Sequence, residues 1–232
     1  MASGIKKNSV NFLVIMYFFN AIIEIIAEFN SYPFVIFLAK PLIPFILIIL
    51  YWFSSKERNI FFILIMLLSL ITNVLFIPKA PQALFYGVIV YTFHRVLLLY
   101  YIFIKSKIKN HKIFILVMLP LFGIFSYLFF ASSDVPDNTY FLLFFHNIMG
   151  AILGGIGISN YIVNDNKQNS LLMISTLLFI GLQMVIYIER YYWYNVNLEY
   201  IRPLAMLLNS FAFFTFYKYV ISTESDNDSL TI

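Results

Sequence analysis

The chain contains no cysteine among its 232 residues, which excludes disulfide bonds, thiolate catalysis and cysteine-ligated metals. Its three histidines, His94, His111 and His146, are scattered, and none falls in an H-E-x-x-H motif. The sequence also lacks a G-x-S-x-G nucleophile motif and a phosphate-binding glycine loop. We therefore expect no metal and no cofactor, and hydrolysis through an activated serine has no local support.

Charged residues are scarce, at 11% of the chain, whereas hydrophobic residues make up 62% and aromatic residues 20%. A soluble domain is roughly one quarter charged. The apolar residues form runs of about 20 residues, the length that crosses a bilayer core as helix. Because backbone groups in lipid must pair within their own segment, these runs are helices rather than strands. The net charge of +4 then belongs to loops at a membrane surface, and nucleic acid is not an expected partner.

These features predict an all-α polytopic membrane protein, a bundle of about eight transmembrane helices. Residues 1–222 form one transmembrane domain and residues 223–232 form a polar C-terminal tail. The first run is not a cleaved signal peptide, because it continues past Phe19 and carries Glu24 and Glu28. The predicted spans are 9–29, 33–53, 60–77, 82–104, 112–130, 140–163, 170–189 and 200–221.

Basic residues in the loops predict the orientation of the bundle. Ten lie on the side of the termini and three on the other, so we expect both termini in the cytoplasm of a bacterial cell. The aromatic segment at 191–200 then lies at the outer interface. The ten are Lys6, Lys7, Lys56, Arg58, Lys105, Lys107, Lys109, Lys112, Lys167 and Lys218, and the three are Lys79, Arg190 and Arg202.

Lys40 lies inside the second span, close to Pro41 and Pro44. Counting residues from the span ends puts Glu24 of the first span at nearly the same depth, so we expect the two to pair. The pair either fixes helix packing or lines a polar cavity in which Lys40 receives a lipid phosphate. The prolines favour the cavity, because the carbonyls that they leave unpaired survive only beside protein or water.

Further polar residues are buried in other spans. His94 and Arg95 fall midway along the fourth, where an arginine faces inward and has a partner. His94 is either a proton donor or a histidine bonded to a neighbouring carbonyl. Asn73 in the third span and Gln183 in the seventh suit interhelical hydrogen bonds. Glu189 and Arg190 form an ordinary exposed pair at the interface.

The sixth span is rich in glycine, and His146, Gly150 and Gly154 share one of its faces. Small residues at this spacing allow a second helix to approach closely. The alternative is that they leave room for a lipid beside His146.

Several short motifs occur together. They are "AKPL" at 39–42, "LLSLITNVLF" at 67–76, His94, and "GAILGGIGISN" at 150–160. With the length and the eight spans, they resemble the YhhN/TMEM86 family of lysoplasmalogenase-like membrane proteins. The family commonly has glycine-aspartate where this chain has Thr72 and Asn73, and often serine-aspartate where it has Ser159 and Asn160. This chain therefore lacks both carboxylates.

The resemblance implies hydrolysis of the vinyl ether bond of lysoplasmalogens, giving an aldehyde and a glycerophospho-alcohol. It also implies a lysophospholipid-like substrate among membrane lipids as partners, and it sets no oligomeric state. Vinyl ethers hydrolyse by protonation at carbon, so the site needs an acid. Glu24 and His94 are the candidate acids, Asn73 and Asn160 would orient water or substrate, and Lys40, Arg95 and His146 would bind substrate.

A second interpretation is a lipid-binding or transport protein without chemistry, because transporters also use broken helices and buried charges. A third is a scaffold protein, which the inward charges disfavour. A closed pocket with Glu24, Lys40 and His94 together would favour the enzyme, and a polar path open at both ends would favour transport.

Overall fold

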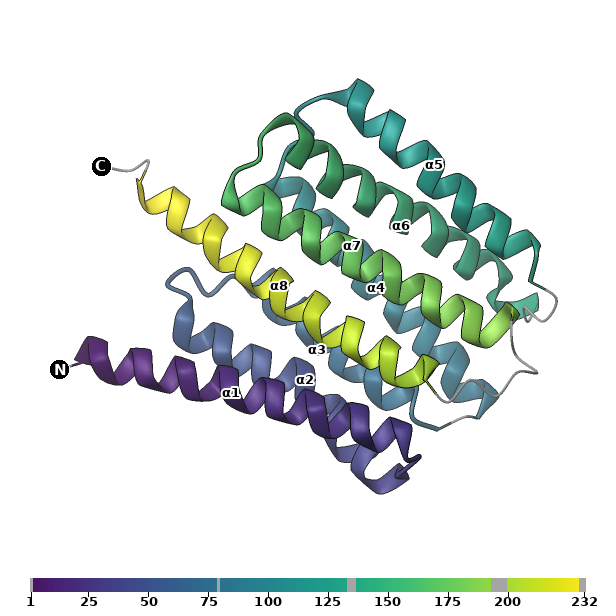
Figure 1. Ribbon diagram of the computed structural model, residues 1–232, viewed down its shortest axis with the longest axis horizontal. Helices are drawn as coiled ribbons and strands as arrows, with labels where there is room; N and C mark the ends of the chain where they lie inside the picture. The colour runs from purple at the N-terminus through teal and green to yellow at the C-terminus, as the bar shows by residue number, and fades with distance from the viewer. Residues whose placement is uncertain (1, 79, 133–136, 193–199, 230–232) are drawn as a thin grey trace.

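The computed structural model describes residues 2–78, 80–132, 137–192 and 200–229 (Figure 1). In these ranges the chain forms eight α-helices, one short π-helical turn and no strand. The elements are α1 (Ala2–Phe29), α2 (Pro33–Ser54), α3 (Ile60–Leu75), α4 (Pro81–Lys105), α5 (His111–Phe130), α6 (Asp137–Val163), α7 (Lys167–Tyr187), η1 (Ile188–Tyr192) and α8 (Ile201–Ser229). Lys79 and most of the aromatic segment 191–200 lie outside the described residues.

Seven helices of the described chain are long and apolar enough to cross a membrane. The remaining helix, α3, has 16 residues, or about 24 Å of helix, which is less than the roughly 30 Å of a bilayer core. The prediction of an all-α polytopic bundle is confirmed, and the protein is an integral membrane protein.

Both termini lie at one end of the bundle, which we call the terminal end; the opposite end is the distal end (Figure 1). Three of the helices that start at the terminal end, α3, α5 and α7, have asparagine caps, in which Asn59, Asn110 and Asn166 accept hydrogen bonds from backbone amides of the first turn. At the distal end, α2 and α4 begin at Pro33 and Pro81, where the missing amide has no consequence.

Seven helices form a closed ring in the order α1, α2, α3, α4, α6, α7 and α8, with α8 packed again on α1. The fifth helix packs on α6 from outside the ring and remains largely exposed to the surroundings (Figure 1). The space inside the ring is therefore bounded by helices that are distant in sequence, above all α4 and α6.

Glycines of α6 provide close contact with α7. A Cβ atom added to Gly154 would lie 2.3 Å from the side chain of Ile180, and one added to Gly157 would lie 2.1 Å from the hydroxyl of Thr176. The close-packing interpretation of the glycine-rich face is therefore confirmed at these two positions.

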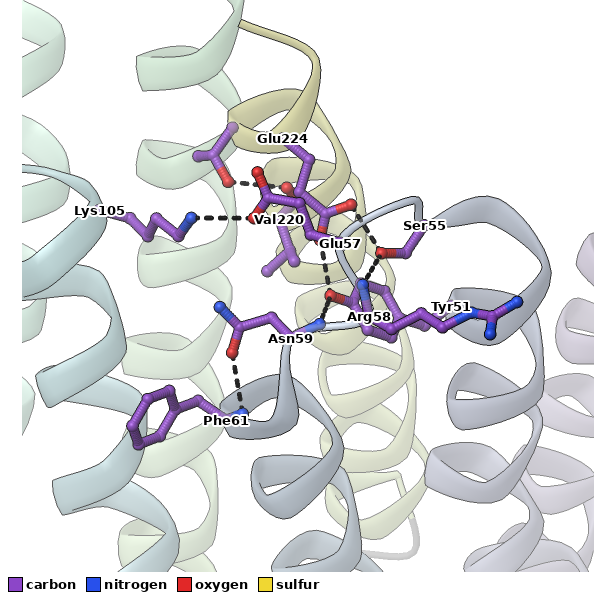
Figure 2. A network of polar contacts seen from close by, with 10 residues as sticks. Tyr51, Ser55, Glu57, Arg58, Asn59, Phe61, Lys105, Val220 and Glu224 are labelled. Carbon is purple, nitrogen blue, oxygen red and sulfur yellow. Dashed lines mark hydrogen bonds and ion pairs between the residues drawn. The ribbon is translucent and has the colours of Figure 1, made fainter. Parts of the chain in front are cut away.

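The last helix continues past the predicted boundary at residue 222. Residues 223–229, expected in a polar tail, extend α8 to Ser229, and Glu224 is buried. Its carboxylate accepts hydrogen bonds from the hydroxyls of Tyr51 (2.6 Å) and Ser55 (2.8 Å) (Figure 2). The end of α2 and the residue that follows it thus provide hydrogen bonds to the Glu224 carboxylate, which the sequence placed in a solvent-exposed tail.

The same two hydroxyls hold the loop itself. The backbone amide of Asn59 donates to the Tyr51 oxygen at 2.7 Å, and that of Arg58 donates to the Ser55 oxygen at 2.8 Å (Figure 2). Glu224 therefore connects the end of α8 to the turn that starts α3.

Replacing Glu224 with alanine should destabilise the bundle. Two buried hydroxyls would lose their acceptor, at about 1–3 kcal/mol for each unsatisfied group. The midpoint of unfolding in detergent should fall. Glu57→Ala is the matched control, because its ion pair with Lys105 is partly exposed and such pairs contribute about 0–1 kcal/mol. Equal midpoints for the two variants would contradict the structural role of Glu224.

Candidate functional site

Lys40 pairs with Glu28, and the expected pairing with Glu24 is wrong. The Lys40 Nζ atom lies 2.9 Å from the Glu28 carboxylate, and both side chains are more than nine-tenths buried. Helical side chains lean toward the start of their own helix. The long lysine side chain therefore extends toward the α1–α2 turn and meets the carboxylate one turn beyond Glu24.

Glu24 is fully buried, and neither of its oxygens has a hydrogen-bond partner among the described residues. It stays close enough to Lys40 to interact with it electrostatically. On the same face of α1, Asn20 donates to the carbonyl of Ala39 at 2.9 Å. Asn20, Glu24 and Glu28, spaced four residues apart on α1, thus face α2.

Asn73 compensates for a proline. Pro44 has no amide hydrogen, so the carbonyl of Lys40, four residues earlier, loses its helical donor. The side-chain amide of Asn73 donates to this carbonyl at 3.1 Å. An ionised aspartate has no hydrogen to donate, so only the amide of asparagine can make this bond.

A cavity of ≈ 140 Å³ lies inside the helix ring toward the distal end, and we call it the distal cavity. Its polar lining comes from six helices and from η1. The polar residues are Lys40, Ser69, Thr72, Asn73, Tyr91, His146, Gln183, Tyr187, Glu189, Arg190, Arg202 and Asn209. The apolar residues are Phe76, Val88, Leu143, Phe179, Leu182, Ile186, Ala205, Met206 and Phe213.

The charges that line the distal cavity are mainly positive, with Lys40, Arg190 and Arg202 against Glu189. Glu189 forms an ion pair with Arg202, and the guanidinium of Arg190 lies 5.7 Å from the ring of Phe76. Glu189, for which the sequence suggested an exposed pair with Arg190, is thus paired across to α8, and all three charged residues line the cavity. The lining favours an anionic ligand.

Hydrogen bonds define the tautomer of His146. The Thr92 hydroxyl donates to the Val88 carbonyl at 2.8 Å, so its oxygen is an acceptor for the His146 Nε2 atom at 2.9 Å. Nε2 therefore carries the ring hydrogen, and Nδ1 is a bare acceptor with no partner in the described chain. His146 lines the cavity, so it can accept a proton or a hydrogen bond there.

Arg95 lies behind the cavity wall and faces inward, as predicted. Its Nε atom donates to the Tyr91 hydroxyl oxygen at 2.7 Å, and its Nη2 atom donates to the same oxygen. The Tyr91 ring stacks on His146 with 4.8 Å between centroids and on His94 with 5.7 Å. Tyr91 lines the cavity, whereas His94 and Arg95 do not.

His94 is buried, and both of its ring nitrogens lack a hydrogen-bond partner in the described chain. The structure therefore does not give it the expected bond to a neighbouring carbonyl.

Asn160 lies far from the distal cavity. It follows His146 by fourteen residues on α6, or about 21 Å of helix. Its side chain donates to Ser106 (2.8 Å) and to the carbonyl of Lys107 (3.2 Å), and it accepts from the amide of Lys109 (3.2 Å). These contacts fix the α4–α5 loop at the terminal end.

The ring of helices brings three of the predicted site residues to one cavity: Lys40, Asn73 and His146. Glu24, His94, Arg95 and Asn160 do not line it. Sequence reasoning missed Tyr91, although its spacing of four residues from Arg95 on one helix face was a signal. The interhelical hydrogen bond predicted for Gln183 is present, because its side-chain amide donates to the His146 carbonyl at 3.3 Å.

Fold and site together define an α-helical membrane protein with a cavity of mixed polarity toward one end of its bundle. The chain matches no protein-family model, and no curated protein or solved structure matches it. The similarity to the YhhN/TMEM86 family therefore depends on the short motifs given above.

The bond from Asn73 to Lys40 should depend on Pro44. Asn73→Ala should lower the free energy of unfolding by about 1 kcal/mol, because the Lys40 carbonyl loses its donor. In a Pro44→Ala background, which restores the helical amide, the same change should have much less effect. A double-mutant cycle of unfolding in detergent measures this coupling.

Pro120→Ala provides the control, because this proline interrupts α5 on the outside of the ring. In that background Asn73→Ala should keep its full effect. Additive effects of Asn73→Ala and Pro44→Ala would contradict the compensation.

Proposed function

We propose that the protein is a lysoplasmalogenase-like lipid hydrolase that binds a single-chain phospholipid in the distal cavity. It cleaves the vinyl ether bond to release an aldehyde and a glycerophospho-alcohol. One observation carries the proposal: Lys40, Asn73 and His146, from three different helices, line one cavity whose charged residues are mainly basic. The first two also belong to the motifs that resemble the YhhN/TMEM86 family.

The distribution of charge and apolar surface supports an anionic amphiphile. The phosphate meets Lys40 and the arginines, while the vinyl ether and the first carbons of the chain contact apolar side chains such as Phe179, Leu182 and Met206. The rest of the ligand's hydrocarbon chain then lies against helix side chains that face the bilayer. When the lipid binds, the Lys40 ammonium either leaves Glu28 for the phosphate or donates hydrogen bonds to both groups, since it carries three hydrogens.

The chemistry requires an acid and a base. Protonation of the vinyl ether carbon gives an oxocarbenium ion, which water captures to form a hemiacetal that collapses to the aldehyde. His146 supports the second step, because its bare Nδ1 atom can take a proton from the attacking water. Glu24 and His94, the candidate acids from the sequence, do not line the cavity, so another group donates the proton.

Lipid binding without hydrolysis is the second candidate, and the positions of Asn73 and Asn160 favour it. Both stand where the family has carboxylates, and both use their side-chain amides as hydrogen-bond donors to the backbone. A transport role receives less support. Phe179 and Phe213 line the base of the cavity, and Phe179 also contacts Phe216 with 6.5 Å between ring centroids, so aromatic side chains separate the cavity from the terminal end.

We also propose that the protein resides in a bacterial cytoplasmic membrane with its terminal end in the cytoplasm. The basic loops 105–112 and 56–58 are at that end, as the positive-inside rule requires. The distal cavity then lies in the outer half of the bundle and takes its lipid from the outer leaflet.

The absence of cysteine allows a direct test of this orientation. A single cysteine at Asn30, exposed at the distal end, should react with an impermeant maleimide added to intact cells. A single cysteine at Asp165, exposed in the α6–α7 loop, should react only after the membrane is permeabilised. The reverse labelling pattern would place the termini outside.

Purified protein in detergent should release aldehyde from a lysoplasmalogen. Lys40→Met should weaken binding of the lipid by about 10- to 100-fold, because a charge-assisted hydrogen bond is worth roughly 1.5–3 kcal/mol. Aldehyde release and equilibrium lipid binding are measured on the same preparations.

Two control variants accompany Lys40→Met. Glu28→Gln frees Lys40 without removing it and should preserve binding, and Lys112→Met changes a lysine at the terminal end and should have no effect. Saturable binding without aldehyde would favour the second candidate. Binding that Lys40→Met leaves unchanged would contradict the assignment of the phosphate to the distal cavity.

A further inference from the structure

The Arg95 guanidinium lacks the carboxylate partner that a buried cation needs. The residue is 1% exposed, and none of the described carboxylates forms an ion pair with it. A buried charge without an opposite charge is strongly unfavourable. Its described hydrogen bonds are the two donations to the Tyr91 hydroxyl oxygen, and its Nη1 atom has no hydrogen-bond partner among the described residues.

These donations determine what the Tyr91 hydroxyl can do. A phenolic oxygen accepts through its lone pairs and donates one hydrogen. Because Arg95 already supplies two donors to the oxygen, the remaining capacity of the hydroxyl is its own proton. Tyr91 lines the distal cavity, and its ring is held between His146 and His94. The proton is therefore available to a ligand in the cavity.

We propose that Tyr91 is the catalytic acid of the distal cavity and that Arg95 is its positioning residue. The inference rests on the proposed hydrolysis. His146 and Lys40 are less suited to the role, because the Nε2 hydrogen of His146 is engaged by Thr92 and the Lys40 ammonium is engaged by Glu28.

The proton transfers balance in three steps. The Tyr91 proton moves to the vinyl ether carbon, which leaves a phenolate and an oxocarbenium ion. Water adds to the oxocarbenium carbon and gives a proton to Nδ1 of His146, which forms a neutral hemiacetal. The carbon–oxygen bond to glycerol then breaks: the departing oxygen takes the proton from His146, and the hemiacetal hydroxyl returns a proton to Tyr91.

Arg95 contributes most in the first step. Its charge has no counter-charge while Tyr91 is neutral, and it faces a negative oxygen once the proton has left. An interaction that strengthens only as charge develops lowers the barrier rather than merely improving binding. This gives a buried arginine within a membrane helix a catalytic use.

Tyr91→Phe tests the inference, because it preserves the ring and its stacking and removes only the hydroxyl. Single-turnover aldehyde release at saturating lysoplasmalogen should fall by about 100-fold or more. Binding of an alkyl-ether lysophospholipid, which has no vinyl bond to protonate, should change by less than about tenfold. Tyr101→Phe is the matched control, since Tyr101 is buried on the same helix and does not line the cavity.

Further variants address folding and positioning. If Tyr91→Phe alone disrupts folding by leaving Arg95 without an acceptor, Tyr91→Phe combined with Arg95→Met removes the charge as well and should fold without hydrolysing the lipid. Arg95→Lys preserves the charge but has no forked pair of donors. It should lower kcat and leave KM nearly unchanged, which a purely structural role would not produce.

The outcomes separate this inference from the proposed function. If the native protein and the Tyr91→Phe variant hydrolyse the lipid at the same rate, the role of Tyr91 is overturned and the hydrolase proposal is left intact. Native protein that binds the lipid and releases no aldehyde would overturn both. Loss of aldehyde release in Tyr91→Phe with binding retained would support both.

Discussion

Lys40 presents two groups that need partners where water is absent, its ammonium and its main-chain carbonyl. The ammonium pairs with Glu28, and the carbonyl, left without a helical donor by Pro44, accepts from Asn73. Glu28 belongs to α1 and Asn73 to α3, so the two contacts of Lys40 connect α2 to both neighbouring helices. In a membrane, an unpaired polar group is costly, so these contacts stabilise the packing of the three helices.

The distal cavity follows from that arrangement. Lys40 of α2 and Asn73 of α3 line one side of the space, and residues of α4, α6, α7 and α8 line the rest. Cationic groups exceed anionic ones in its lining, and Arg95, which forms no ion pair with a described carboxylate, donates to the hydroxyl of Tyr91. The excess of positive charge is the feature that a bound phosphate and a transient phenolate would neutralise.

Buried polar groups at the terminal end also need hydrogen-bond partners, and there the partners come from different residues. There Glu224 is the buried charge, and hydroxyls of α2 and the loop after it supply the hydrogen bonds. Asn160 performs a comparable task for the α4–α5 loop. Polar residues in this bundle therefore serve two purposes: those at the terminal end hold loops, and those at the distal end line a cavity.

The membrane class and most helix limits could be predicted from the sequence, because runs of about 20 apolar residues have few alternatives. The partner of Lys40 could not, since depth counted along backbones ignores the length and lean of a lysine side chain. Tyr91 was missed because its role depends on α4 packing against α6, which are not neighbours in sequence. Glu224 was assigned to a tail because composition cannot reveal that Tyr51 would be its partner.

The central claim is that the distal cavity holds a single-chain phospholipid by its phosphate. An experimental structure of the protein in lipid nanodiscs, with a non-hydrolysable alkyl-ether lysophospholipid, tests it most directly. The account predicts the phosphate within hydrogen-bonding distance of Lys40 Nζ and the ether-bearing carbons against Tyr91 and His146. Lipid found only on the outward faces of the helices, with the cavity filled by water alone, would contradict it.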